Sequence, residues 1–290
     1  MPSLKDLRNR IDSVKSTRKI TLAMKMVAAS KLKKAQGLAE KGRDYSRGLD
    51  DIAKGLVASL DNKDNIFLES DSKVDKTLIL VISSDRGLCG GLNSSLVKKA
   101  KLLLNNLEKS NKKITLMCIG KKGYDLLYSF NKKYFNSEKK FVLISDMDYQ
   151  STEELGLNIL GKFYDRKFEE CYIFYNFFKS VISQEVVEKK LIPYEENSYG
   201  VEKKDTAFYE YEPDEETVLS KILPKNFIVQ MYKAILESRA SEQGARMTAM
   251  DNATRNAGEM IDKLTLKYNR TRQAQITTEL IEIISGAEAV

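Results

Sequence analysis

Two long stretches at opposite ends of the chain constrain its fold more than any other feature. The stretches from Ser3 to about Leu60 and from Pro224 to about Ser285 contain no internal proline, and their apolar side chains recur at steps of three and four. This spacing places the apolar side chains on one face of an α-helix. At 1.5 Å per residue the two helices would be roughly 80 Å and 90 Å long. A helix with one narrow apolar face is not stable alone in water, so each must bury that face.

The most available partner for each helix is the other one. The residues between them bring the chain back to its start, so the two helices are expected to pack antiparallel. In the second helix Ala245, Ala249, Ala253 and Ala257 recur at four-residue steps, and such small side chains let a partner helix approach closely. Pro224 is expected to begin this helix, because the first turn does not need the N–H that proline lacks.

The residues between the two helices read as alternating strands and helices. Continuous apolar runs indicate buried strands at 77–82, 114–119 and 171–177, with a short strand at 141–145. The helices are expected at 92–107, 121–130 and 151–166, the last opened by a capping box of Ser151 and Glu154. A further strand and a long loop are expected within 181–211. Alternating strands and helices favour parallel pairing with right-handed crossovers, and therefore a small three-layer α/β domain.

The predicted fold class is therefore an α/β insert plus a long antiparallel two-helix coiled coil formed by the N- and C-terminal helices. The expected domains are an N-terminal coiled-coil helix at 1–60, an α/β (Rossmann-like) domain at 61–212 and a C-terminal coiled-coil helix at 213–290. No window of the sequence reaches the roughly 18 consecutive apolar residues that a membrane span needs. The first residues enter an amphipathic helix without the apolar core of a signal peptide.

The composition lacks several of the residue types that most often carry out catalysis. The chain has no histidine, and its three cysteines lie far apart without a CxxC pair. These counts argue against a zinc cluster, a disulfide framework and the commonest general base. We expect no catalytic residue, no metal and no cofactor. The net charge of +7 favours an acidic partner, which could be nucleic acid, an anionic membrane surface or acidic protein loops.

Two local motifs have competing interpretations. The turn at 84–91 follows a strand and precedes a helix, where α/β proteins often bind phosphate, but it lacks the spacing of a phosphate loop. A tight structural turn is the favoured interpretation. The basic residues of the first helix suit either nucleic acid or an acidic protein surface. A coiled-coil adaptor or nucleic-acid-binding protein and a nucleotide-binding enzyme are therefore the alternative functions.

Three groups of residues, in order along the chain, resemble the ATP synthase gamma subunit family. The groups are Lys19-Ile20-Thr21 with Ala23-Met24 and Met26-Val27-Ala28-Ala29-Ser30-Lys31; Asp85-Arg86-Gly87-Leu88-Cys89-Gly90-Gly91-Leu92-Asn93; and Ala240-Ser241-Glu242-Gln243 with Ala245-Arg246-Met247, Ala249-Met250, Tyr268-Asn269, Arg272-Gln273-Ala274, Ile276-Thr277, Glu279-Leu280 and Ile284-Ser285-Gly286-Ala287. The segment Tyr209-Glu210-Tyr211-Glu212-Pro213-Asp214 resembles the foot of that family's shaft.

The resemblance implies a central rotor shaft of an F-type ATP synthase that has no active site of its own. In that family the two helices turn inside a ring of alternating alpha and beta subunits, and the α/β foot rests with the epsilon subunit on the membrane c-ring. Ion flow turns the c-ring and the foot, and the shaft drives the beta subunits through their nucleotide states. The resemblance implies no nucleic-acid partner and a peripheral place on the cytoplasmic face of the bacterial plasma (inner) membrane, in preference to the mitochondrial inner membrane.

The resemblance also assigns contact residues. It places Met24, Lys25, Arg246, Gln273, Thr277 and Glu279 against beta-subunit loops, and Tyr209, Glu210 and Tyr211 on the foot, toward the c-ring or the epsilon subunit. It further implies that Met24 lies near Arg246. The C-terminal helix is expected to outrun its partner from about Thr271 and to leave a set of apolar side chains exposed: Ile276, Leu280, Ile281, Ile283 and Ile284.

Overall fold

The computed structural model describes residues 3–59, 65–68, 75–135, 141–194, 212 and 214–288. The chain divides into two compact units. One unit contains the residues up to Ser30 together with those from Arg246 onward, and the other is the continuous stretch Lys31–Ala245. Helices α1 (Leu4–Ser59) and α5 (Glu215–Glu288) each contribute to both units.

The larger unit is built around a four-stranded sheet with the order β2-β1-β3-β4. Its strands are β1 (Lys76–Ile82), β2 (Lys113–Ile119), β3 (Glu170–Phe178) and β4 (Gln184–Ile192). β1 pairs in parallel with both β2 and β3, which confirms the expected parallel pairing, whereas β4 is antiparallel to β3. The short connection between β3 and β4 explains this difference, because a parallel partner needs a crossover of a dozen residues or more.

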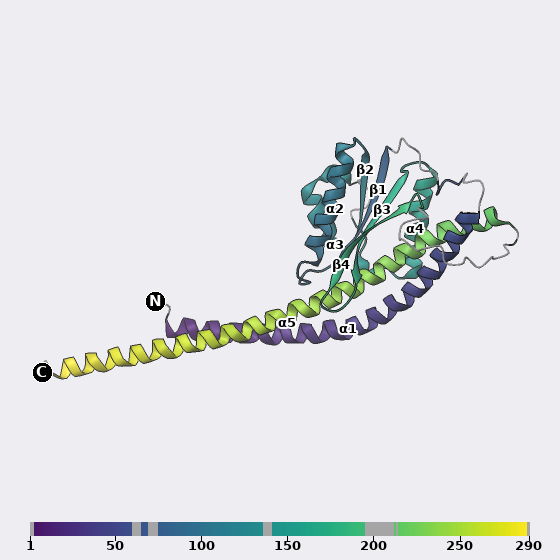
Figure 1. Cartoon of the computed structure of the whole chain (residues 1–290). Coiled ribbons are helices and arrows are strands. Elements are labelled where there is room, and N and C mark those ends of the chain that lie inside the picture. Colours follow the sequence, from purple (N-terminus) through teal and green to yellow (C-terminus); the bar gives the residue numbers. More distant parts are fainter. Residues whose placement is uncertain are drawn as a thin grey trace. The chain divides into compact units, whose positions relative to one another are not determined.

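Helices cover both faces of this sheet, as the expected three layers require. Ile79 and Val81 of β1 point into a core shared with α2 (Leu92–Lys109) and α3 (Lys121–Phe130). The alternate residues Leu78 and Leu80 point into a second core on the opposite face. Figure 1 shows α2 and α3 on one side of the sheet and α4 (Tyr149–Tyr164) on the other.

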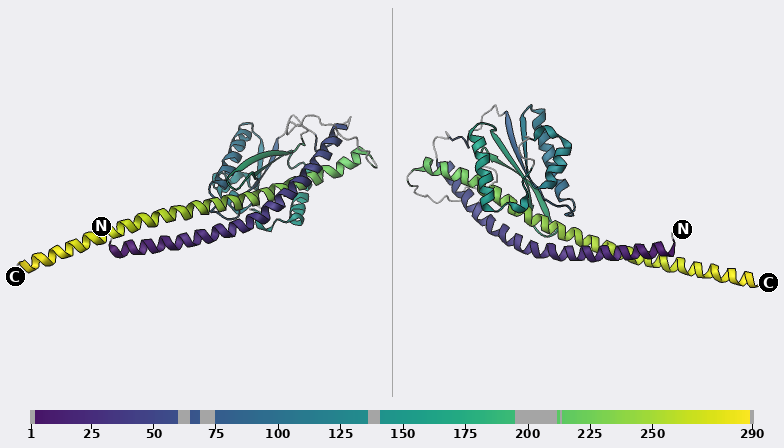
Figure 2. Two further views of the ribbon diagram at one scale, coloured as in Figure 1. Left: turned by 60° about the horizontal axis from the view of Figure 1, so that its bottom comes forward. Right: turned by 180° about the vertical axis from the view of Figure 1, so that it is seen from behind.

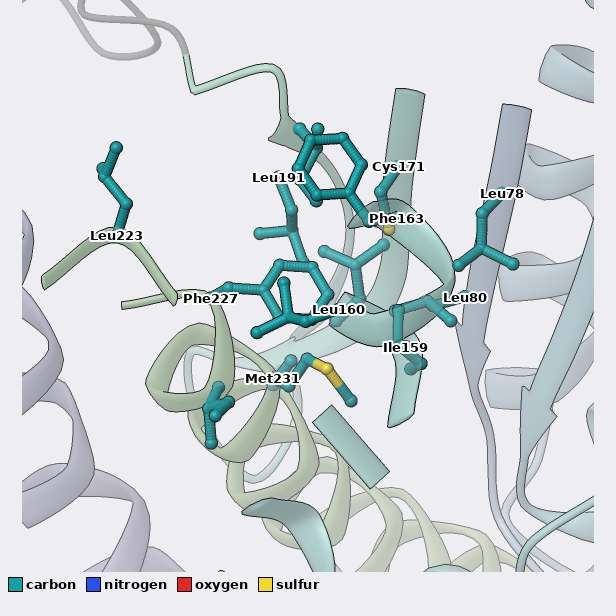
Figure 3. Close-up of a cluster of buried hydrophobic side chains, with 14 of the residues drawn as sticks. Leu78, Leu80, Ile159, Leu160, Phe163, Cys171, Leu191, Leu223, Phe227 and Met231 are labelled. Carbon is teal, nitrogen blue, oxygen red and sulfur yellow. The ribbon is translucent and has the colours of Figure 1, made fainter. Parts of the chain in front are cut away.

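The second core joins the sheet to all three helices on that face. Figure 3 shows Phe163 of α4, Phe227 and Met231 of α5 and Leu80 of β1 in one cluster of buried side chains. Residues near the end of α1, including Leu56, belong to the same cluster. Within the larger unit, the nearby parts of α1 and α5 therefore form part of the third layer.

Three local expectations prove wrong. Helix α4 begins after Asp148, whose carboxylate accepts a hydrogen bond from the Ser151 N–H at 2.8 Å, so Ser151 is not the capping residue. The expected strand at 141–145 is reduced to a single bridge between Val142 and Ile119, followed by a 3₁₀ turn at Ile144–Asp146. A further 3₁₀ turn spans Lys132–Tyr134.

The third correction concerns Pro224, which lies inside α5 rather than at its start. A proline in a helix interior costs about 3 kcal/mol relative to alanine, because it removes one hydrogen bond and crowds the preceding turn. Leu219, Leu223 and Phe227 on either side of it are all buried in the second core. Their burial fixes the helix on both sides of the proline, so α5 begins at Glu215 and continues through Pro224 without a break.

A matched pair of glycines on α4 tests this packing. A Cβ at Gly156 would lie 2.7 Å from Ile228 Cγ1 of α5, whereas a Cβ at Gly161 would meet nothing within 4 Å. We expect Gly156→Ala to lower the free energy of unfolding by about 1–3 kcal/mol through overpacking. Gly161→Ala should instead raise it by about 0.5–1 kcal/mol, because alanine is the better helix former. Denaturant unfolding of both variants makes the comparison, and equal effects would show that α4 does not press on α5.

Candidate functional site

The smaller unit is an antiparallel pair of helix segments with one constant register. Arg8 donates a hydrogen bond to the Tyr268 hydroxyl at 3.3 Å, and Lys25 Nζ lies 2.7 Å from Asp251 Oδ1. Between these contacts α1 advances by 17 residues while α5 goes back by 17. The hydroxyl of Thr254 donates to that of Thr21 at 2.8 Å, in the same register. Hydrogen bonds therefore occur along the whole interface between these two segments of α1 and α5, which we call the seam.

Small and apolar side chains fill the rest of the interface between the two helix segments. Leu7, Ile11 and Ala28 of α1 are buried, as are Met250 and Ala257 of α5. Of the alanines expected to line this face, Ala257 is buried here, whereas Ala249 and Ala253 are half-buried. The antiparallel coiled coil is thus confirmed in this unit, and both views in Figure 2 show the start of α1 running beside α5.

The expected neighbourhood of Met24 and Arg246 is wrong. Lys25 is paired with Asp251, and Asp251 lies five residues beyond Arg246 on α5. At 1.5 Å per residue, the expected register is therefore displaced by more than one helical turn. The register implied by the resemblance therefore differs from the one that the Lys25–Asp251 pair sets.

The expected contact residues fall into two separate places. Met24, Lys25 and Arg246 are half-buried beside the seam. By contrast, Gln273, Thr277 and Glu279 are exposed near the end of α5. The Thr277 hydroxyl donates to the Gln273 carbonyl at 2.9 Å, and Gln275 donates to the Glu279 carboxylate at 3.3 Å. The positions Tyr209, Glu210 and Tyr211 lie outside the described residues.

The end of α5 continues beyond the start of α1, as both views in Figure 2 show. Every residue from 272 to 287 is exposed, which confirms the expectation that this helix outruns its partner. Large apolar side chains are among them: Ile276, Leu280, Ile281, Ile283 and Ile284. Exposed apolar side chains gathered on one helix mark an interaction surface.

A second exposed apolar group lies on α1, and the sequence analysis did not separate it from the seam. Ile20, Met26 and Val27 are 60%, 63% and 55% exposed. Their neighbours Thr21 and Ala28 are buried in the seam. The signal was present in the sequence, because apolar residues from 20 to 28 occupy more of the helix than one narrow face can hold.

The turn after β1 is held by hydrogen bonds to the segment at 144–145 and to the start of α2. The Asp85 carboxylate accepts hydrogen bonds from the N–H groups of Ile144 and Ser145, each at 3.0 Å. Asn93 bonds the backbone N–H of Ser84 at 3.2 Å and its hydroxyl at 2.7 Å. Cys89 is buried beside Leu92 and Ala245. A carboxylate inside the turn repels phosphate, so the geometry favours the structural interpretation of this motif.

The larger unit contains a buried polar cluster that the sequence analysis missed. β3 pairs with β1 only as far as Phe174, so Asn176 and Phe178 extend past the end of that ladder. The Ser238 hydroxyl accepts from the Asn176 N–H at 3.3 Å, and the Ser241 hydroxyl donates to the Asn176 carbonyl at 2.9 Å. Side chains of α5 thus take the place of a neighbouring strand.

The ion pair between Arg43 and Glu237 takes the place of a neighbouring strand at Phe178 in the same way. The Glu237 carboxylate accepts from the Phe178 N–H at 3.0 Å, and Arg43 of α1 donates to the Phe178 carbonyl at 2.6 Å. Arg43 also binds both oxygens of Glu237, and its guanidinium lies 4.5 Å from the Phe177 ring centre. The hydrogen bond to Glu237 is the main cause that raises the pKa of Arg43. We call the four side chains that bond this edge the edge clamp: Arg43, Glu237, Ser238 and Ser241.

Arg239, in the same stretch of α5, reaches a different part of the larger unit. Its guanidinium donates to the Ile144 carbonyl, with the Nε–O distance at 3.0 Å. Burial lowers the pKa of Arg239. Sequence reasoning could have noted that Glu237, Ser238, Arg239 and Ser241 interrupt an otherwise apolar stretch, which is the one signal for buried polar groups.

No helix among the described residues is long and apolar enough to cross a membrane. In the same part of the chain, histidine, cysteine, aspartate and glutamate side chains form no group of three or more that could hold a metal ion.

Comparisons with known proteins agree along the whole chain. The family model described as ATP synthase matches residues 3–290. The ATP synthase gamma chain of Pelagibacter ubique is 49% identical over 292 residues, and that of Rhodospirillum rubrum is 47% identical over 307 residues. Each alignment covers 100% of both chains.

Solved structures show the same fold. A chain of the Tetrahymena thermophila mitochondrial ATP synthase central stalk and c-ring is 27% identical, with a TM-score of 0.60, and the match covers 81% of this chain and 99% of that one. A chain of the Euglena gracilis mitochondrial ATP synthase is 24% identical, with a TM-score of 0.72, and the match covers 99% and 94%. At that identity the second match is evidence for the fold alone.

An α/β insert carried on two antiparallel terminal helices, one of which projects alone, defines the class of central-stalk subunits. This chain belongs to the ATP synthase gamma chain family. The expected function is thereby favoured over the adaptor, nucleic-acid-binding and nucleotide-binding alternatives.

Hydrogen exchange on the free and the assembled protein tests the role of the projecting end. We expect weak protection of residues 276–284 in the free chain, because a single helix without a partner is marginal in water. Within a complete ATP synthase the same residues should be strongly protected. Met250 and Ala257 in the seam serve as controls and should be protected in both states. Strong, equal protection of 276–284 in the free chain would contradict the assignment.

Proposed function

We propose that this chain is the rotating shaft of an F-type ATP synthase. It couples ion-driven rotation of the membrane c-ring to the conformational cycle of the catalytic beta subunits, in synthesis or hydrolysis of ATP. The observation that carries the proposal is the projecting end of α5, where every residue from 272 to 287 is exposed and several are large and apolar. Membership of the gamma chain family supports the same assignment.

The geometry suits a part that must turn inside a bearing. Apolar side chains such as Ile276 and Leu280 offer contact that is not directional, so a surrounding sleeve can slide past them. The seam behind them is marked by bonds at fixed positions, including Lys25 to Asp251 and Thr254 to Thr21. The projecting end of α5 can therefore slide against a surrounding sleeve, while the seam keeps α1 and α5 in a fixed register.

The proposed contacts with the beta subunits lie at two levels. Met24, Lys25 and Arg246 are assigned to the level of the seam. At this level the Lys25 ammonium is already bonded to Asp251, and that hydrogen bond lowers the pKa of Asp251. We therefore assign Lys25 to the interior of the shaft as much as to its surface.

The second level is the projecting end of α5, where Gln273, Thr277 and Glu279 are exposed. Gln273 and Glu279 also accept hydrogen bonds from within the helix. We place alpha and beta subunits around both levels.

The remaining partners are assigned to the larger unit. We propose that the epsilon subunit and the c-ring bind the α/β part, with Tyr209, Glu210 and Tyr211 among the contacting residues. The proposed division into helix 1–60, α/β domain 61–212 and helix 213–290 is supported by the bounds of α1, of the strands and of α5. We also propose a peripheral place on the cytoplasmic face of the bacterial inner membrane; the relatives named above are bacterial.

Genetic replacement tests the proposed function directly. A bacterium that lacks its own gamma chain should regain ion-driven ATP synthesis in membrane vesicles when it carries this chain. The alpha, beta and epsilon subunits and the c-ring should then co-purify with it. A variant that ends after Thr271 serves as a matched control, because it keeps the seam and loses the projecting end. Full synthesis by that variant, or none by the intact chain, would contradict the proposal.

We also propose that the chain itself carries no ATP site. The turn at 84–91 is hydrogen-bonded to Asn93, Ile144 and Ser145, and it contains the Asp85 carboxylate, which opposes a phosphate electrostatically. Titration calorimetry of the purified chain with ATP and magnesium should show no saturable site at micromolar concentration. Asp85→Asn is a useful comparison, since it removes the repelling charge. Saturable micromolar binding by the wild-type chain would refute this proposal.

A further inference from the structure

The edge clamp differs in kind from the apolar contacts that join the sheet to α1 and α5, and it bonds the β3 backbone, unlike the hydrogen bond from Lys189 of β4 to Gln230 of α5 at 3.1 Å. Apolar burial resists separation of two surfaces without fixing their orientation. The edge clamp consists of hydrogen bonds, which weaken steeply when donor and acceptor are turned out of line. Its four bonds to the β3 backbone measure between 2.6 and 3.3 Å, and all end on Asn176 or Phe178.

The clamp lies where a force can pass between the sheet and the two helices. Asn176 and Phe178 belong to β3, which also pairs with β1 and β4, so a force applied at this edge is shared with the sheet. Glu237 belongs to α5 and Arg43 to α1, so the same force reaches both helices. The clamp is therefore a point where three elements meet through directional bonds.

Glu237 lies at the centre of this arrangement. Its side chain is 0% exposed, and it bonds both the Arg43 guanidinium and the Phe178 N–H. Hydrogen bonds to ionised groups are roughly twice as strong as those between neutral groups. A buried carboxylate that lost either partner would carry a large desolvation penalty, so rotation of α5 against the sheet is strongly opposed here.

We infer that the edge clamp is the point through which torque passes between the α/β layer and the two helices, with Glu237 as the main positioning residue. The inference rests on the proposed function, because torque has meaning only for a rotating shaft. The side chains of the clamp fix the orientation of α5 about its own axis, because they complete the hydrogen bonds of the β3 edge.

The experiment uses the assembled complex in inverted membrane vesicles and measures two rates together. One is ATP hydrolysis, and the other is ATP-driven uptake of the coupling ion, with and without an opposing ion gradient. The variants are Glu237→Gln, which removes the charge, and the double variant Ser238→Ala with Ser241→Ala, which removes two neutral hydrogen bonds. The double variant leaves no buried charge unpaired, so it remains informative if the first variant fails to fold.

Glu170→Gln provides the matched control. Glu170 is also a buried carboxylate, and its partners Lys112, Lys190 and Thr77 are 2.9, 3.2 and 3.3 Å away. Two of these partners belong to strands, and Lys112 immediately precedes one, so the variant weakens the sheet without touching α1 or α5. The amount of assembled complex and its melting temperature are recorded for every variant.

We expect both clamp variants to keep ATP hydrolysis, while their ion uptake per ATP falls at least about twofold against an opposing gradient. Glu170→Gln should keep the wild-type ratio even where it lowers the melting temperature. An unchanged ratio in the clamp variants, or an equal fall in Glu170→Gln, would overturn the inference. If the wild-type chain itself supports no ion uptake, the proposed function fails rather than the clamp.

Discussion

The buried carboxylate of Glu237 is the interaction on which the larger unit depends. An isolated charge in a protein interior costs several kcal/mol, and this cost is offset only when the partners are in place. Those partners come from α1 and β3, which lie far from α5 in the sequence. The three elements are therefore stable in this arrangement only together. The apolar cluster beside them, with Phe163 and Phe227, has the same requirement because it draws on α4, α5 and the sheet.

One consequence is that the packing unit does not follow the linear order of the chain. Residues of α1 such as Leu56 and residues of α5 such as Met231 share a core with β1 and β3. Gly42 of α1 allows an especially close approach to α5, since a Cβ there would lie 2.9 Å from Leu236 Cδ1. The helices change their partners along their length, from each other alone to each other and a sheet.

The features that could be predicted from the sequence are those indicated by a pattern that many residues share. The strands β1, β2 and β3 were found within a residue or so, because each is a continuous apolar run such as 77–82. The paired terminal helices were predicted by stripes that repeat over dozens of residues. The exposed end of α5 was also predicted correctly. The edge clamp, the helical register and the continuation of α5 through Pro224 were missed because each depends on contacts with residues remote in sequence.

Pro224 and the edge clamp show why such features escape a reading of the sequence. Local preference places a proline at a helix start, and only burial of Leu223 and Phe227 in the core overrides it. Similarly, Glu237 and Ser241 look like ordinary solvent-facing residues until the end of β1 leaves the edge of β3 unpaired. The register between α1 and α5 had the same difficulty, because alanines at regular steps fit equally well in several alignments. Lys25 and Asp251 select one of them.

The seam also sets the order in which the chain can fold during synthesis. Arg8 and Tyr268 are separated by 260 residues, so the partner of the first helix is among the last parts to leave the ribosome. At about 5–20 residues per second, this interval lasts roughly 10–50 s. During that time the apolar stripe of α1 has no partner, while its many lysines and arginines keep it in solution and repel other copies. The basic residues of α1 therefore have a role during synthesis, before α1 and α5 have paired.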